Sequence, residues 1–307
     1  MTKLRSILKF FTAVEQSEGV GARVRRTIGT FQQRNFSPFL MLDHFTVGAP
    51  AGFPDHPHHG QETITYVLSG MIAHEDFTGS SGVLRPGDLQ FMTAGKGIVH
   101  SEIPVEMENG EPSVGLQLWV DLPAHLKNCE PRYRDLRAAE TPVAHPHPGL
   151  EVRVISGKSY GVSSASELAY TPVNMYHFKL SKKDVDFDQP FAQNFNTFMY
   201  ILKGSVKIAG KVYEPYSAIF FNPDGDAIAG QSASDDTEFV LVGGEILNQP
   251  VVQMGPFVET SRERIAAVYN NYQHGVNGFE RAPGWTSSIS NGITENEVKS
   301  HENDQKH

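Results

Sequence analysis

Short apolar runs rich in β-branched and aromatic residues recur along the chain, and most are bounded by glycine, proline or serine. The run at 64–68, between Gly60 and Ser69, is a clear example. Runs of this length and composition predict buried strands. Their recurrence along the whole chain is typical of a β-sandwich or β-barrel. The other clear runs lie at 89–92, 116–120, 152–155 and 239–242.

Helical periodicity is rare in this sequence. The best candidate is 260–269, where Ser261 can cap the N-terminus and Ile265, Val268 and Tyr269 fall on one face. The pattern therefore predicts an all-β protein with a short helix near the C-terminus.

The strand pattern occurs twice. Residues 63–70 align with 197–204, and five of these eight positions are identical or exchange Val for Ile. Residues 86–91 align with 215–220 at nearly the same offset. A strand–turn–strand unit repeated in this way indicates a duplicated domain. The length of 307 residues also fits two domains.

Two short motifs in the first copy carry ligand-type side chains: His56-Pro57-His58 and His100-Ser101-Glu102. In a strand, residues i and i+2 share a face, so each motif directs two side chains the same way. If the two strands pair or face each other, three imidazoles and one carboxylate converge. Such a set suits iron, manganese, nickel, copper or zinc.

The second copy lacks this set. At the repeat offset none of its residues can replace an imidazole or carboxylate ligand. We therefore expect one metal site per chain and a metal-free second domain. The corresponding positions are Pro190, Ala192, Ala229 and Gln231.

Proline density and polarity predict the domain boundaries. The segment 138–150 is rich in proline and is expected to be an extended linker, although it contains a second His-x-His at 145–147. The last 21 residues are polar with few apolar residues, so we expect disorder there. The predicted division is an N-terminal metal-binding domain 1–137, the linker 138–150, a metal-free domain 151–286 and a disordered tail 287–307.

Composition narrows the function classes. There are 26 Lys plus Arg against 35 Asp plus Glu, a formal net charge of −9, which opposes direct binding to nucleic acid. The single cysteine, Cys129, excludes an intrachain disulfide and favours a reducing compartment. No apolar run approaches the roughly 20 residues of a membrane helix. Residues 1–14 mix basic and apolar side chains as transit peptides do, but we favour an opening strand or arm.

The two motifs lie in longer stretches that resemble the metal-binding stretches of the pirin family of bicupins. These stretches are His56-Pro57-His58-His59-Gly60-Gln61-Glu62-Thr63 and Thr93-Ala94-Gly95-Lys96-Gly97-Ile98-Val99-His100-Ser101-Glu102. Similarity to that family extends over roughly residues 10 to 287. It also includes the segments 15–26, 54–58, 86–95, 115–120, 255–258 and 277–281.

The resemblance implies two tandem cupin domains, with a non-haem iron (Fe2+/Fe3+) in the first. The residues that match its ligands are His56, His58, His100 and Glu102. A more general cupin pattern would instead nominate Glu62, which has the same strand parity as the first two histidines. The pirin pattern uses the later glutamate, so we expect Glu62 near the site or in the pocket wall. Mn, Ni, Cu and Zn remain compatible with the ligand set.

Two residues depart from the pirin pattern. His59 and Gln61 occupy positions that are arginine and an aromatic residue in many pirins. His59 has the opposite parity to His58, so its side chain is expected to leave the metal face. Gln61 is expected to alter the pocket mouth, and with it substrate preference.

The resemblance leaves two functions open. The first is quercetin 2,3-dioxygenase activity, in which a flavonol and dioxygen react, the metal binds the 3-hydroxyl oxygen, and Glu102 accepts the hydroxyl proton as general base. The alternative is a redox-dependent transcription coregulator, cytoplasmic or nuclear, that binds a regulatory protein through Arg23, Arg25 and Arg26. A vestigial site without metal is a third, weaker hypothesis, since all four ligand types are present. No membrane partner is expected.

Overall fold

The apolar runs predicted as strands all fall within strands of the protein. The computed structural model describes residues 2–19, 21–165 and 168–304. The predicted runs lie in β6 (Gln61–Ser69), β9 (Leu89–Thr93), β11 (Ser113–Asp121), β14 (Leu150–Ser156) and β24 (Thr237–Glu245).

The predicted helix is also present, as α1 (Arg262–His274). Ser261 caps it and its side chain accepts a hydrogen bond from the backbone N–H of Arg264. Ile265 and Val268 are buried, but Tyr269 is largely exposed, so the apolar face is narrower than predicted. In the part of the chain that the structure describes, no helix is long and apolar enough to cross a membrane.

The chain forms two units, and each draws on three stretches of sequence. The first unit comprises Glu15–Arg26, Leu40–Ala138 and Asn248–His307. The second unit comprises Met1–Val14, Thr27–Phe39 and Ala139–Leu247.

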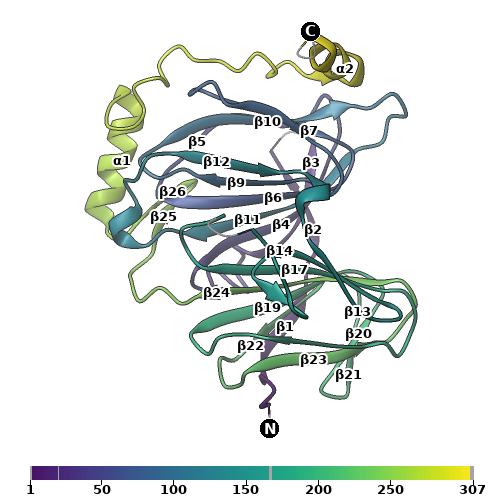
Figure 1. Cartoon of the computed structure of the whole chain (residues 1–307). Helices are drawn as coiled ribbons and strands as arrows, with labels where there is room; N and C mark the ends of the chain where they lie inside the picture. The colour runs from purple at the N-terminus through teal and green to yellow at the C-terminus, as the bar shows by residue number, and fades with distance from the viewer. Residues whose placement is uncertain (1, 20, 166–167, 305–307) are drawn as a thin grey trace. The chain divides into compact units, whose positions relative to one another are not determined.

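The first unit contains two main sheets and two helices among its described residues (Figure 1). A seven-stranded sheet has the order β12 (Arg132–Leu136), β9, β6, β11, β4 (Phe39–Val47), β3 (Ala22–Ile28) and β2 (Glu15–Glu18). The other sheet has the order β27 (Ile293–Thr294), β10 (Ile98–Glu106), β7 (Ile72–Asp76) and β8 (Ser81–Leu84), and β5 (Phe53–His58) pairs with β10. The remaining elements are the hairpin β25 (Val252–Met254) and β26 (Phe257–Glu259), the 3-10 turn Ala124–Leu126, and α2 (Glu295–Asp304).

The second unit repeats this plan. Its seven-stranded sheet has the order β1 (Ile7–Thr12), β22 (Ser217–Phe221), β19 (Phe195–Lys203), β24, β17 (Val173–Leu180), β14 and β13 (Val143–His147). Its smaller sheet has the order β18 (Asp186–Pro190), β23 (Ala227–Ser232), β20 (Val206–Ile208) and β21 (Lys211–Tyr213). A short hairpin, β15 (Lys158–Ser159) and β16 (Val162–Ser163), and the 3-10 turn Ala138–Glu140 complete the described elements.

The strand register supports the internal repeat residue by residue. Tyr66 pairs with Leu89 in the first unit, and the residues aligned with them, Tyr200 and Ala218, pair in the second. Ile64 and Phe91 correspond in the same way to Phe198 and Phe220. The two units therefore share one sheet plan as well as one sequence pattern.

The boundaries of the units differ from the predicted division. Strand β1 pairs with β22, so the N-terminal residues belong to the second unit. The segment 138–150 contains β13, an edge strand, where proline is tolerated because the missing N–H faces away from the ladder. The proline content predicted a linker here, because composition does not distinguish a proline in an edge strand from a proline in a linker.

The C-terminal tail also differs from the prediction of disorder. It contains β27 and α2, and Ile289, Ile293 and Val298 pack against Met71 and Val105. A few apolar residues at the right spacing are enough to hold a polar segment. Residues 305–307 of the predicted tail lie outside the described residues.

A buried ion pair connects the hairpin β25–β26 to the rest of the first unit. Lys127 is fully buried, and its Nζ donates to Asp121 Oδ1 at 2.6 Å, to Gly60 O at 2.9 Å and to Val258 O at 3.3 Å. Burial raises the pKa of Asp121 although Lys127 opposes that shift. The ammonium is therefore needed to keep this carboxylate compatible with the interior.

We predict that Lys127→Met lowers the free energy of unfolding by about 3 to 5 kcal/mol, because it leaves Asp121 buried without its cation. Chemical denaturation followed by circular dichroism measures this. Lys299→Met removes a lysine from exposed ion pairs with Glu108 and Glu295 and is the matched control, with little change expected. Equal stability of the two variants would contradict the role given to Lys127.

Candidate metal centre

The two ligand-type motifs lie on paired strands. β5 and β10 run antiparallel, and His56 stands opposite His100. The Nε2 atoms of these two residues are 3.0 Å apart. The ring of His58 lies 4.9 Å from that of His56 and 5.0 Å from that of His100, centroid to centroid. One nitrogen from each of the three rings lies within 4.8 Å of the other two.

Glu102 faces the same interior. Its Oε2 is 4.0 Å from His100 Nε2. Thr65 donates a hydrogen bond to Glu102 Oε1 at 3.2 Å, and Gln117 Nε2 donates to Oε2 at 2.8 Å. The structure thus brings the three predicted histidine ligands together and places the fourth predicted ligand, Glu102, beside one of them, His100.

Trp119 determines how Gln117 can hold Glu102. The indole Nε1–H of Trp119 donates to Gln117 Oε1 at 2.9 Å. Because an indole nitrogen only donates, the amide oxygen must face Trp119 and the amide NH2 must face Glu102. The ring of Trp119 also packs edge-on against His58 at 5.1 Å. One tryptophan therefore restrains two of the four predicted ligands.

The residues present fit a metal ion. Within the described residues, His58 Nε2 is buried without a hydrogen-bond partner. His56 Nδ1 lies 2.9 Å from Pro54 O, which leaves Nε2 free of its proton to bind a metal. Two nitrogens at right angles on one ion, each about 2.1 Å from it, are about 3.0 Å apart. The separation of His56 and His100 matches that spacing.

The electrostatics of the site favour the neutral form of two of the three imidazoles, those of His58 and His100. Burial lowers the pKa of His58 well below its usual value, and the charge of His56 adds to this. Burial likewise lowers the pKa of His100, with contributions from His56, His58 and His74. Neutral imidazole is the form that binds a metal.

His59 and Glu62 both point away from the metal face. His59 is buried, with Nε2 3.0 Å from Glu259 Oε1 and Nδ1 3.0 Å from Lys96 O, as its parity predicted. Glu62 accepts a hydrogen bond from Thr93 Oγ1 at 2.6 Å. The parity that linked Glu62 to the histidines does not hold, because a turn at Gly60 separates β5 from β6.

The turn at Gly60 requires glycine. Its φ is +70°, and a Cβ there would lie 2.0 Å from Val258 O. Side chains at odd positions of β6 face the metal side after this turn, as the Thr65 contact with Glu102 shows. Gln61 is therefore buried at the site instead of lining the mouth. Its Nε2 lies 2.7 Å from His58 Nδ1 and donates to Pro256 O at 3.1 Å.

Sequence reasoning missed Thr65, Gln117, Trp119 and Tyr133. The first three become neighbours only through the register of β6 and β11. Tyr133 stacks on His74 at 6.1 Å. Burial raises its pKa well above the usual value and the carboxylates of Asp76 and Glu102 add to the shift, so the phenol stays a hydrogen-bond donor. The alternation of apolar and polar residues along one strand does not show which residues of a neighbouring strand they contact.

The basic cluster expected to bind a partner is largely neutralised by the chain itself. Arg23 and Arg25 both contact Glu15, at 2.8 and 3.3 Å. Arg26 contacts Glu18 at 2.9 Å and Asp43 at 2.7 Å. The cluster therefore offers little excess positive charge to an acidic partner.

The second unit has an aromatic interior. Phe178, Phe187 and Phe239 pack against one another with ring centroids 4.7 to 5.7 Å apart. The position aligned with His56 is Pro190, at the end of β18. That this unit binds no metal remains a prediction.

Comparison with known proteins identifies the family. The family model described as Pirin matches residues 21–120, and the one described as Pirin C-terminal cupin domain matches residues 175–278. The chain belongs to the pirin family. Its two units are therefore the two cupin domains of a bicupin, as the resemblance predicted.

Individual relatives of this pirin-family protein cover almost all of it. Pirin of Homo sapiens is 43% identical over 283 residues, which are 90% of this chain and 95% of the human protein. A pirin-like protein of Solanum lycopersicum is 41% identical, over 92% of this chain and 96% of its own length. The crystal structure of quercetin 2,3-dioxygenase from Acinetobacter baumannii has a TM-score of 0.81 at 26% identity, and covers 89% of this chain and 98% of its own.

The depressed histidine pKa values predict acid sensitivity of the metal-free protein. Unfolded histidines take up protons near the ordinary pKa of 6.5, whereas folded His58 and His100 do not. The unfolded state then binds more protons, so the free energy of unfolding falls as the pH drops below about 6.5, by up to about 1.4 kcal/mol per pH unit for each histidine.

Denaturant unfolding of the metal-free protein between about pH 7 and about pH 5 measures this slope. A His58→Gln plus His100→Gln variant should show a clearly shallower slope. The same slope in both proteins would contradict the burial of neutral imidazoles.

Proposed function

We propose that this protein is a non-haem metal oxygenase of the quercetin 2,3-dioxygenase type, with iron as the leading candidate metal. His56, His58, His100 and Glu102 would hold one ion in the first cupin domain. The observation that carries the proposal is the convergence of three buried or half-buried imidazole nitrogens, with the Glu102 carboxylate 4.0 Å from His100 Nε2. Mn, Ni, Cu and Zn suit the same ligand set, and the test below compares iron with copper, manganese and nickel.

Four protein ligands would leave two positions open on a six-coordinate ion. When bound, the metal supplies Lewis acidity toward the 3-hydroxyl oxygen of a flavonol and redox chemistry toward dioxygen. Glu102 Oε2, which faces the histidines, would accept the hydroxyl proton. Both oxygen atoms of dioxygen enter the ring-opened product, and one ring carbon leaves as carbon monoxide.

The chain's own residues prepare this chemistry. Thr65 donates a hydrogen bond to one oxygen of the Glu102 carboxylate and Gln117 donates to the other, which fixes its orientation. Trp119 and Gln61 restrain the ring of His58 from two sides. Residues held in this way need little reorganisation when a ligand binds.

One structural neighbour supports the oxygenase hypothesis, and one feature of this chain weakens the alternative. A structure described as a quercetin 2,3-dioxygenase shares the fold over 89% of the chain. The coregulator hypothesis rests on the resemblance to pirins and takes the arginine cluster as its partner surface. That cluster is paired with Glu15, Glu18 and Asp43. The single cysteine fits the cytoplasm or nucleus under either hypothesis.

Oxygen uptake with quercetin tests the activity. The protein is reconstituted anaerobically with iron, copper, manganese or nickel, and dioxygen is then admitted. We expect uptake dependent on quercetin with at least one metal, together with release of carbon monoxide. Absence of uptake with all four metals would refute the proposal.

His100→Ala tests the ligand assignment, because it removes a buried imidazole at the centre of the set. We expect metal and activity to be lost together, as measured by elemental analysis and oxygen uptake. His145→Ala is the matched control, since it removes an exposed histidine from the other His-x-His motif, in β13. A full metal load in His100→Ala would show that this residue is not a ligand.

A further inference from the structure

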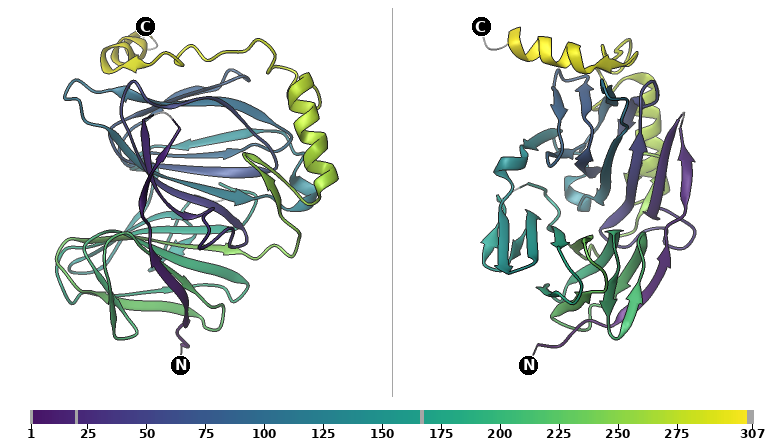
Figure 2. Two further views of the ribbon diagram at one scale, coloured as in Figure 1. Left: turned by 180° about the vertical axis from the view of Figure 1, so that it is seen from behind. Right: turned by 90° about the vertical axis from the view of Figure 1, so that its right-hand side faces the viewer.

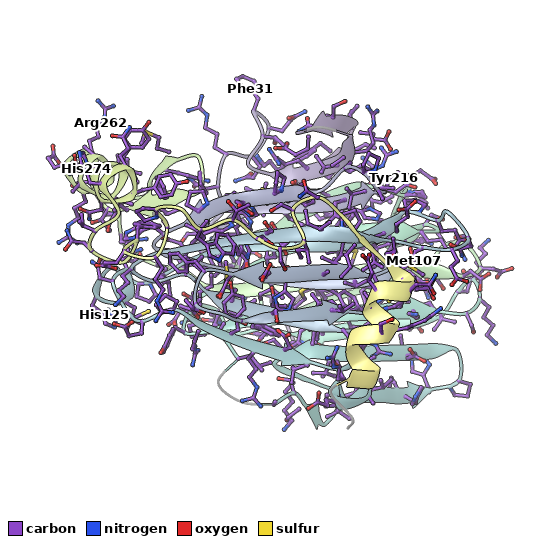
Figure 3. The ribbon with its side chains drawn as sticks, turned by 90° about the horizontal axis from the view of Figure 1, so that it is seen from above. Phe31, Met107, His125, Tyr216, Arg262 and His274 are labelled. Atoms are coloured by element: carbon purple, nitrogen blue, oxygen red, sulfur yellow. The ribbon has the colours of Figure 1, made fainter. Side chains whose placement is uncertain are left out.

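The C-terminal strap, defined here as residues 287–294, crosses the outer face of the strands that carry the predicted ligands. Figure 3 shows the yellow connection between α1, near the labelled His274, and α2, near the labelled Met107; the strap is the part of this connection that leads into α2. The left view of Figure 2 shows the same yellow segment extended above the blue strands of the first unit. The strap and strands all belong to the first unit.

The strap is fixed to two carboxylates on this outer face. Glu75 Oε2 accepts hydrogen bonds from Ser287 Oγ at 2.7 Å, Ser288 N at 2.7 Å and Ser288 Oγ at 3.0 Å. Asp55 Oδ1 accepts one from Ser290 Oγ at 2.9 Å. The serine donors lower the pKa of Glu75 against the effect of burial, so the carboxylate stays ionised.

The residues on this outer face are next in the sequence to residues whose side chains face the interior. Asp55 precedes His56, and Ser101 lies between His100 and Glu102. Ser101 stands opposite Glu75 in the pairing of β10 with β7, and its hydroxyl donates to Asp55 Oδ1. Because side chains alternate along a strand, the outer row of Asp55, Ser101 and Glu75 lies directly behind the inner row.

Asp55 lies at an irregularity between the two ligand strands. His100 pairs with His56, but Glu102 pairs with Phe53, so β5 has one residue more than β10 between these pairs. Such a bulge re-aims neighbouring side chains and weakens the ladder locally. The hydrogen bonds of Asp55 to Ser101 and to the strap span this weak point.

The strap is itself anchored further along β10. Ile293 and Thr294 pair with Val105 and Glu106. Ile289 and Ile293 pack against a small apolar cluster that includes Val105. The strap thus contacts β10 beyond Glu102 and β5 just before His56.

We propose that the strap is a brace that holds the register of β5 against β10, with Asp55 and Ser290 as positioning residues for His56 and Glu102. The proposal rests on the metal ligands proposed above. It predicts that breaking the Ser290–Asp55 contact loosens the metal site although neither residue touches the metal.

The test uses full-length Ser290→Ala and Asp55→Ala, with Ser300→Ala as the control because that exposed hydroxyl donates to Asn296 O within α2. In metal-free protein we expect faster backbone amide exchange at 53–58 and 98–106 in both strap variants. In Co2+-loaded protein we expect Co2+ loss to a chelator, followed by visible absorption, to accelerate about tenfold in Asp55→Ala and less in Ser290→Ala. The control should behave like the parent in both assays.

A double-mutant cycle of Ser101→Ala and Ser290→Ala checks the route through Asp55. Both hydroxyls bond the same carboxylate oxygen, so their effects on Co2+ loss should be non-additive. Unchanged exchange in Ser290→Ala and Asp55→Ala would overturn the proposal. So would faster exchange without faster Co2+ loss, because the strap would then only stabilise the sheet. A parent that fails to bind Co2+ would refute the proposed ligand set, and amide exchange would still decide whether the strap braces β5 against β10.

Discussion

The antiparallel pairing of β5 with β10 is the constraint on which the candidate metal centre depends. It places His56 opposite His100, and strand alternation then places His58 and Glu102 on the same inner face. A shift of either strand by one residue would turn the two predicted ligands of that strand toward the outside. The bulge beside Asp55 makes this register vulnerable, and the contacts on the outer face compensate for it. The two faces of one strand pair therefore have different tasks: the inner face collects ligand atoms and the outer face holds the pairing.

Burial sets the chemistry that this geometry can perform. His58 and His100 are buried deeply enough to remain neutral, and Glu102 is held by donors from β6 and β11. The orientation of Gln117 follows from the indole of Trp119, which can only donate. The second cupin domain keeps the same sheet register but fills its interior with aromatic rings. Duplication has thus produced one domain with a polar interior suited to a metal and one whose interior is apolar packing.

The sequence alone is sufficient to predict the fold class from the strand pattern, the repeat from internal similarity, and the two pairs of ligand-type side chains from strand parity. The choice of Glu102 over Glu62 came from the resemblance to pirins, and the sequence left open whether the two pairs meet. The sequence does not predict features that depend on how strands distant in the sequence pair with one another. Glu62 shares the parity of His56 in sequence, but the turn at Gly60 reverses the face. Gln117 and Trp119 become neighbours of the ligands only through the pairing of β11 with β6. The polar tail is held by a few isoleucines and by carboxylates far away in sequence, which composition cannot reveal.

The most direct test of the account is anomalous X-ray diffraction from crystals of the metal-loaded protein, recorded on both sides of the absorption edge of the metal. The account predicts one anomalous peak per chain, within coordination distance of His56, His58, His100 and Glu102. A peak bound by Glu62 in place of Glu102, or a peak of equal height in the second cupin domain, would contradict it.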